Sequence, residues 1–489
     1  IASTESGKAI PNICYHANST APVHPGLAAC DHEEASTGLQ WIIFIAQMIN
    51  GFAAACLYSL TPAYIEANAS KTKSTRLLSY FLATAPAGVA FGFITGGMFI
   101  RTGAWGIPFI ISGILLIVVS FFMYRMPKKM PSTDANSLSE EEGGKPGTPA
   151  TMSMTEFVKD AKEILANPVF LMFALAAGVE AFFITGINNY GPKIFSSYFG
   201  MSNGDASIIA GALLVPAAVF GQVVGGVMDS KRSKTLSMTA SFTKYIALVA
   251  FILVVSASLI QCPTIKPETS SDIKCGAKCG CLKTYDPVCI GHKIHLNGCD
   301  AGCDQYDEQT MKYDGCTLCD TVVGDGIKVT HGVCSELICK AKVPFLIVFF
   351  VAIFATFMNN PPSQMVMMRV VDERLQANAL SVNDFLYRAV GSLPAMPVWA
   401  AAIDGTCIVW NYDVCGTKGN CGLYDNERIG TNVMLPLGGV PKLASFLAFL
   451  FGSIVLLRKF PDKAQAPYED IRSQSSEMTN LESADSQSD

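Results

Sequence analysis

The chain has 489 residues, of which 50% are hydrophobic and only 15% are charged, and its formal net charge is −5. Soluble domains carry about a quarter charged residues, and the mean hydropathy of this chain is +0.34. This composition excludes an ordinary soluble protein and indicates a membrane protein. The sequence also has no phosphate-binding loop, no metal-ligand pair at helical spacing and no nucleophile elbow, so we do not expect an enzyme.

Long apolar segments predict an all-α polytopic membrane protein. A bilayer core of about 30 Å is crossed by about 20 apolar residues in a helix. Nine segments of the sequence fit this length: 41–65, 77–100, 104–124, 168–190, 206–228, 238–260, 343–368, 376–403 and 433–457. Prolines such as Pro216 and Pro394 lie inside them, which membrane-spanning helices tolerate when neighbouring helices satisfy the freed backbone groups.

The basic residues between these segments predict the orientation, because cytoplasmic loops are rich in Lys and Arg. The loops after the second and fourth segments contain only Arg101 and Lys193, respectively, whereas basic clusters follow the first, third, fifth, seventh and ninth segments. We therefore expect a multi-pass plasma-membrane protein with a cytoplasmic C-terminus and an extracellular residue 1. An extracellular start at Ile1, without Met or a signal peptide, predicts that further spans precede it.

Cysteine usage agrees with this orientation. All of the 17 cysteines except Cys56, which lies in the first span, fall in segments predicted to be extracellular. An even number suits a fully oxidised exterior, and the spacing lacks the two CxxC pairs of a typical zinc site. We predict disulfides, with the pairing left open, for Cys14, Cys30, Cys262, Cys275, Cys279, Cys281, Cys289, Cys299, Cys303, Cys316, Cys319, Cys334, Cys339, Cys407, Cys415 and Cys421. Asn18, in an Asn-Ser-Thr sequon on the same side, is the predicted glycosylation site.

These features divide the chain into predicted regions. Residues 1–40 are extracellular, residues 41–124 form three spans, and residues 125–167 form a cytoplasmic linker. Three more spans occupy 168–260, a Cys-rich extracellular domain occupies 261–342, and three last spans with an outer Cys loop at 404–430 occupy 343–458. The polar tail 459–489 and most of the linker are predicted to be disordered. Within the linker, Thr155 to Ala166 predicts a short amphipathic helix lying against the membrane.

The Cys-rich stretch from Cys279 to Cys303 resembles a Kazal domain. The resemblance rests on Tyr285-Asp286-Pro287-Val288-Cys289 and on the Cys-x3-Cys formed by Cys299 and Cys303. His295 stands where such domains usually have tyrosine. We interpret this extracellular module as a structural cap, because nothing in its sequence argues for an exposed inhibitory loop.

Several stretches together resemble the organic anion transporting polypeptides. A Kazal-like insert between two spans is characteristic of that family. TGAWGIPFIISG from Thr102, YGPKIFSSYFGMS from Tyr190, the region from Asn359 to Trp410, and CGTKGNCGLYDNERIG from Cys415 are similar to family motifs. The chain departs from them at Gly106, which replaces a tryptophan of the signature, and at Asn50, which replaces an arginine of the fourth span.

This resemblance implies a divergent member of a branch of the major facilitator superfamily, with twelve spans in two six-helix halves. The nine visible segments would then be the fourth to the twelfth. It also implies sodium-independent uptake of amphipathic organic anions such as bile salts, steroid conjugates, thyroid hormones and prostanoids, with a counter-anion such as bicarbonate. No cofactor, metal or nucleic acid is expected, and the sequence does not set the oligomeric state.

Ionisable residues inside spans are candidate functional residues, because burying a charge in the bilayer is costly. Arg388 lies near the middle of its segment, matches an arginine of the family's eleventh span, and is the predicted contact for the substrate anion. Asp384 lies four residues earlier on the same helix face, so a neutralised structural pair is the alternative. Glu180 either couples transport to protons or pairs with a basic residue in spans that precede residue 1.

Uncharged polar residues in or near the spans are further candidates for lining the substrate cavity. They are Asn188, Asn189, Gln222, Asn359, Asn360 and Asn383. Hydrogen bonding between helices would explain them equally well. Two other functions stay open: a receptor or adhesion protein that acts through the Cys-rich module and uses its spans as an anchor, and a carrier of a different substrate. Intramembrane charges such as Arg388 and Glu180 argue against a mere anchor.

Overall fold

The computed structural model describes most of the chain as a helical bundle with short strands at one end. The described residues are 37–68, 71–102, 106–125, 154–201, 203–267, 281, 283–303, 305–307, 312–314, 316, 329–334, 339–412 and 417–465. The helices are α1 (Thr37–Asn68), α2 (Lys71–Thr102), α3 (Ile107–Tyr124), α4 (Met154–Ala166), α5 (Pro168–Phe199), α6 (Asn203–Arg232), α7 (Leu236–Leu259), α9 (Lys342–Met358), α10 (Asn360–Val370), α11 (Gln376–Leu386), α12 (Leu393–Asp404), α13 (Asn426–Arg428), α14 (Val440–Lys459) and α15 (Pro461–Gln465). Tighter or wider turns form η3 (Glu373–Leu375), η4 (Tyr387–Ser392) and η5 (Ile429–Gly439).

The nine apolar segments predicted from the sequence all fall on helices where the structure describes them. The seventh is α9 followed by α10, the eighth is α11, η4 and α12, and the ninth is η5 and α14. Six helical stretches in the described residues are long and apolar enough to cross a membrane: Thr75–Gly96, Pro168–Phe199, Gly204–Arg232, Leu236–Leu259, Lys342–Val370 and Asn426–Lys459. The chain is thus an all-α bundle of membrane-spanning length.

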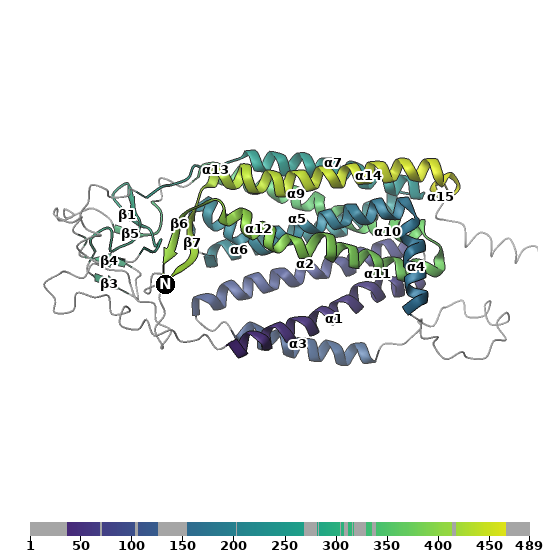
Figure 1. Cartoon of the computed structure of the whole chain (residues 1–489), viewed down its shortest axis with the longest axis horizontal. Coiled ribbons are helices and arrows are strands. Elements are labelled where there is room, and N and C mark those ends of the chain that lie inside the picture. The colour runs from purple at the N-terminus through teal and green to yellow at the C-terminus, as the bar shows by residue number, and fades with distance from the viewer. Residues whose placement is uncertain are drawn as a thin grey trace, which may run out of the picture.

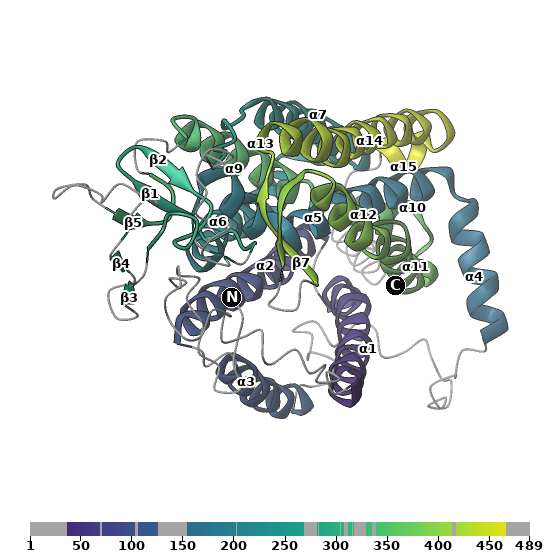
Figure 2. The same cartoon turned by 60° about the vertical axis from the view of Figure 1, so that its left-hand side comes forward.

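The long helices run along one common direction, with the labelled strands at one end and α15 at the other, where α4 lies across that direction (Figure 1). In both views α1, α2 and α3 lie on one side of the molecule, while α5, α7, α9, α12 and α14 lie on the other (Figures 1 and 2). The first group contacts the rest of the bundle through α2, which packs against α6, and through α1, which packs against α11. We call the strand-bearing end the Cys-rich end and the opposite one the α4 end.

Short antiparallel strands build the Cys-rich end. Strands β2 (Lys293–His295), β1 (Val288–Ile290) and β5 (Val329–His331) form one sheet in that order, with Cys289 opposite Ile294 and Thr330. Strands β3 (Gln305–Asp307) and β4 (Lys312–Asp314) form a second sheet. Between α12 and α13, β6 (Cys407–Tyr412) and β7 (Lys418–Tyr424) pair as a third.

Helix α5 runs through the middle of the second group of helices. It begins at Asn167, whose side-chain oxygen accepts hydrogen bonds from the backbone N–H groups of Val169 and Phe170, with Pro168 as the first helical residue. Such a cap satisfies N–H groups that have no partner in the first turn, and proline there loses no hydrogen bond. The helix ends at Gly200, whose φ of 61° is the left-handed conformation that glycine adopts without strain. These signals fix the position of the residues that α5 presents to its neighbours.

A π-helical segment, η4, interrupts the span formed by α11 and α12. Pro394 follows it and has no N–H to donate to the preceding turn, which favours a local departure from α-helical bonding. Gly391 lies at the contact with α5, where an added Cβ would overlap the carbonyl oxygen of Gly178. The close approach of η4 to α5 therefore requires glycine, and it fixes the rotation of the segment that contains Arg388.

This contact predicts opposite effects for the same substitution at two glycines. Gly391→Ala forces a methyl group into the backbone of α5 and is expected to destabilise the protein by about 1–3 kcal/mol. Gly96→Ala is the matched control, because a Cβ there meets nothing within 4 Å among the described residues, so alanine gains roughly 0.5–1 kcal/mol of helix propensity. The melting temperatures of the detergent-purified variants would check this. Equal effects at both positions would contradict the close contact.

Helix α4 coincides with the amphipathic helix predicted from Thr155 to Ala166, and its place against the membrane stays a prediction. It packs on the bundle, where Ile164 is buried in a core cluster with Phe170 and Leu375. The Arg374 Nη2 atom donates to both carboxylate oxygens of Glu163, at 2.7 and 2.8 Å. The apolar face of α4 thus packs on an apolar surface of the bundle, and its acidic face binds a basic residue just before α11. That basic residue lies over 200 positions away in the sequence, so the local pattern of α4 does not predict it.

Candidate functional site

A cavity of about 320 Å³ lies among α1, α2, α5, α6, α9, α10, α11 and η4. Its wall is mostly apolar, with Leu82, Phe93, Ile187 and Phe357 among the lining residues. Small-molecule sites usually have volumes of roughly 300–1,000 Å³ and apolar walls with a few polar groups. The cavity therefore has the size and character of a site for a compact amphipathic molecule.

One ion pair faces this cavity. The Arg388 Nε atom donates to the Asp384 Oδ2 atom at 3.0 Å, which is the contact that their i,i+4 spacing predicts. The Arg388 side chain is nevertheless 42% exposed, and it lines the cavity from the second residue of η4. One edge of the guanidinium thus binds Asp384, while the side chain stays accessible to a second anion.

Five carboxamide side chains line the same cavity. Gln222 comes from α6, Asn383 from α11 and Asn188 from α5, while Asn360 and Gln364 come from α10. The Gln364 Nε2 atom donates to the Asn360 Oδ1 atom at 3.2 Å. Asn360 lies where proline residues interrupt the seventh apolar segment, so these polar groups enter the cavity at an irregular point in the span.

Two of the polar candidates lie away from the cavity. The Asn189 Nδ2 atom donates to the carbonyl oxygen of Thr185 in its own helix, at 2.8 Å. Asn359 is buried at the junction of α9 and α10, while its neighbour Asn360 lines the cavity. The wall also contains three polar residues that were not predicted from the sequence: Gln364, Tyr58 and Tyr387. Gln364 follows Asn360 by one helical turn, and that spacing is a usable signal.

Glu180 belongs to a second, buried charged cluster. Its Oε2 atom accepts a hydrogen bond from the Nζ atom of Lys442 in α14, and the same Nζ atom donates to Thr356 Oγ1 at 2.7 Å. The Lys442 side chain is 1% exposed and lies over the ring of Phe183, 4.7 Å from its centroid. The expected partner in spans before residue 1 is therefore wrong, because a basic residue of this chain takes that role. Lys442 was missed although it lies well inside the ninth apolar segment, where any charge is informative.

Five disulfides are present in the described residues, and all lie at the Cys-rich end. They join Cys262 to Cys339, Cys281 to Cys299, Cys289 to Cys334, Cys303 to Cys316 and Cys407 to Cys421. Ten of the predicted cysteines are thus paired. The remaining six, together with the glycosylation candidate, lie outside the described residues: Cys14, Cys30, Cys275, Cys279, Cys319, Cys415 and Asn18.

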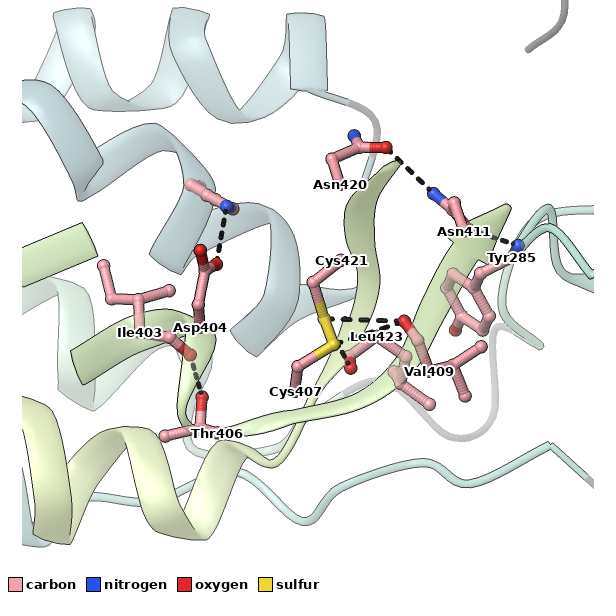
Figure 3. Close-up of a disulfide and its surroundings, with 11 residues drawn as sticks. Tyr285, Ile403, Asp404, Thr406, Cys407, Val409, Asn411, Asn420, Cys421 and Leu423 are labelled. Atoms are coloured by element: carbon pink, nitrogen blue, oxygen red, sulfur yellow. Dashed lines mark hydrogen bonds and ion pairs between the residues drawn. A yellow bond between two sulfur atoms is a disulfide. The ribbon is translucent and has the colours of Figure 1, made fainter. Parts of the chain in front are cut away.

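The β6–β7 hairpin joins the Cys-rich insert to the helices (Figure 3). The Cys407–Cys421 disulfide links its two strands, and the Asn411 Oδ1 atom accepts a hydrogen bond from the backbone N–H of Tyr285 at 2.7 Å. At the base of the hairpin, Asp404 pairs with Lys193 at 3.6 Å. Burial raises the pKa of the Tyr424 phenol, and the nearby Asp404 carboxylate raises it further. The insert is therefore held against the bundle by specific contacts.

Comparisons with known proteins agree with this architecture. A sequence profile of the organic anion transporter polypeptide family matches residues 3–429. The chain belongs to this family. Solute carrier organic anion transporter family member 4C1 from Homo sapiens is 26% identical over 481 residues, which cover 87% of this chain and 64% of that protein. Member 4A1 from Mus musculus is 27% identical and is matched over 84% of this chain and 63% of its own length.

The chain spans slightly less than two thirds of the length of these curated relatives. Among solved structures it is similar to a bacterial homologue of the human lysosomal transporter Spinster, in an inward-facing and unoccupied conformation. That similarity has a TM-score of 0.42 at 15% identity and covers 83% of this chain and 75% of that chain. Family membership, the apolar helices and the disulfides together describe a multi-pass membrane protein of a transporter family.

Proposed function

We propose that this chain forms the substrate cavity of an alternating-access carrier for amphipathic organic anions. The position of Arg388 carries the proposal: an accessible guanidinium in an otherwise mostly apolar cavity. A guanidinium binds carboxylate, sulfate or sulfonate groups through two parallel hydrogen bonds. The apolar wall suits the hydrocarbon body of the same molecule, because burying that surface is favourable. Bile salts, steroid conjugates, thyroid hormones and prostanoids combine these two features.

The remaining parts of the proposal follow from family membership and from the sequence pattern. Transport is sodium-independent and exchanges the substrate for an anion such as bicarbonate. The protein resides in the plasma membrane with its C-terminus in the cytoplasm and its Kazal-like Cys-rich end outside. Asn18 is glycosylated. The two groups of helices alternate access to the cavity by rocking about it, as in other secondary transporters.

Uptake of a labelled sulfated steroid tests the proposal, with the protein expressed in cells as its gene encodes it. We expect saturable accumulation inside the cells that unlabelled sulfated steroid inhibits and that the uncharged parent steroid inhibits at least tenfold less strongly. A receptor that acts through the Cys-rich end would instead bind label at the surface without accumulating it. Surface labelling of the protein is the control for expression, and absence of accumulation despite normal surface levels would refute the carrier.

A further inference from the structure

Two buried side chains of the cavity wall carry acceptor oxygens without a hydrogen-bond partner among the described residues. They are the Gln222 Oε1 atom and the Asn383 Oδ1 atom. Gln222 is 2% exposed and Asn383 is 7% exposed, and both line the cavity. Buried polar atoms are hydrogen-bonded in the great majority of cases, because water no longer solvates them. Two such oxygens at the wall of one cavity therefore need an explanation.

The other side chains of the cavity wall that the structure describes donate no hydrogen bond to these two oxygens. The nearby carboxamides Asn360 and Gln364 bond to each other. The Arg388 guanidinium is bound to Asp384, the residue that follows Asn383. Both oxygens are uncharged acceptors that require a donor, and neither accepts a hydrogen bond from any described residue. A donor carried by the transported molecule would satisfy both.

The two neutral acceptors lie on other elements of the cavity wall than the cationic Arg388. Asn383 precedes Arg388 by five residues, about a turn and a half of helix. Gln222 lies on α6, which packs against α2, α5, α9 and α10, and Arg388 lies on η4, which packs against α5, α11 and α12. A molecule bound at Arg388 by its anion would extend its apolar body along the wall, where the carboxamides of Gln222 and Asn383 face it.

We infer that Gln222 and Asn383 form a second, neutral subsite that accepts hydrogen bonds from hydroxyl groups on the body of the anion. This inference rests on the proposed function. It narrows the substrate class to amphipathic anions with hydroxyl groups remote from the charge. Anions whose body is a plain hydrocarbon would bind less tightly. Discrimination follows because a site built to bind a hydroxyl group leaves its own buried polar atoms unpaired when an analogue lacks that group.

A matched pair of bile salts tests this subsite. The taurine conjugates of a trihydroxy and a monohydroxy bile salt share one sulfonate and one ring system and differ in their hydroxyl groups. We expect the native protein to have the lower half-saturating concentration for the trihydroxy ligand. Gln222→Leu and Asn383→Leu keep the approximate volume but remove the acceptor, and each is expected to reduce this preference about tenfold. Asn432→Leu, an exposed carboxamide outside the cavity, is the control and is expected to leave the preference unchanged.

The outcomes separate the subsite from the proposed function. If the native protein takes up both conjugates with equal half-saturating concentrations, or if the Leu variants retain the preference, the subsite is refuted while anion transport stands. If it takes up a sulfated steroid but neither conjugate, the subsite is likewise refuted. If it takes up none of the three, the proposed function fails and the subsite with it. Ligand-induced increases in the melting temperature of the purified protein provide a readout independent of transport. Gln222→Met and Asn383→Ala, also without the acceptor, replace any Leu variant that does not reach the surface.

Discussion

Replacing Arg388 by alanine is expected to lower uptake of a sulfated steroid at least tenfold at equal surface levels. Hydrogen bonds to a charged group contribute about 1.5–3 kcal/mol, and each 1.4 kcal/mol is a factor of ten. The substitution removes the arginine of the Asp384–Arg388 pair and leaves an unpaired carboxylate beside the bound anion, which adds repulsion. Initial uptake rates over a range of substrate concentrations would measure the effect.

Two further variants separate anion binding from a purely structural ion pair. Arg388→Lys keeps the charge but loses the planar pair of donors, so we expect only partial recovery of uptake. If the pair is structural, Asp384→Ala and Arg388→Ala will lower the melting temperature equally, and the double variant will restore transport. Arg458→Ala, at the exposed end of α14, is the matched control. Unchanged uptake by Arg388→Ala at normal surface levels would remove Arg388 from the substrate site.

The sequence predicted the helices well because a bilayer imposes a simple requirement on length and polarity. Every apolar segment of about 20 residues lies on a helix where the structure describes it. The Asp384–Arg388 pair was predictable for a similar reason, since the two residues share one helix face. Disulfide formation was also predictable from cysteine content, although the connectivity required the fold.

The composition of the cavity was harder to predict, because it depends on helix rotation and on which helices meet. Asn359 and Asn360 are adjacent, yet only Asn360 lines the cavity, and the break between α9 and α10 sets this difference. Consecutive residues of a helix point about 100° apart. An error of one position in the predicted helix phase therefore moves a residue from the cavity wall to another face of the helix. The π-helical turns of η4 shift the helix phase again at Arg388. Apolar periodicity is weak in helices with lipid on one side and protein on the other.

The contact between Glu180 and Lys442 shows the same limit over a longer distance. The two residues are separated by 262 positions, and each was visible in the sequence as a charge inside an apolar segment. The sequence does not predict that α5 packs against α14, and this packing brings Glu180 and Lys442 together. Both charges lie in described helices of membrane-spanning length, so single and double substitutions at these two positions test the pair directly.

Removing either partner of this buried pair is expected to destabilise the protein strongly. Lys442→Met leaves the Glu180 carboxylate without its cation, and breaking one partner of a buried ion pair costs about 3–5 kcal/mol. We expect a large fall in the melting temperature of the detergent-purified variant and a reduced fraction of protein at the cell surface. Lys459→Met, which removes an exposed lysine of the same helix, is the control and should leave both unchanged.

The double variant Glu180→Gln/Lys442→Met decides what the pair does. Replacing both partners of a buried ion pair by uncharged groups is often neutral or stabilising, so most of the lost stability should return. If the double variant also transports, the pair serves to hold α5, α9 and α14 together around the cavity through Glu180, Thr356 and Lys442. If it is stable but does not transport, a charge in this cluster takes part in transport itself, as the proton-coupling alternative for Glu180 requires. Normal stability of the single Lys442→Met variant would contradict the buried pair altogether.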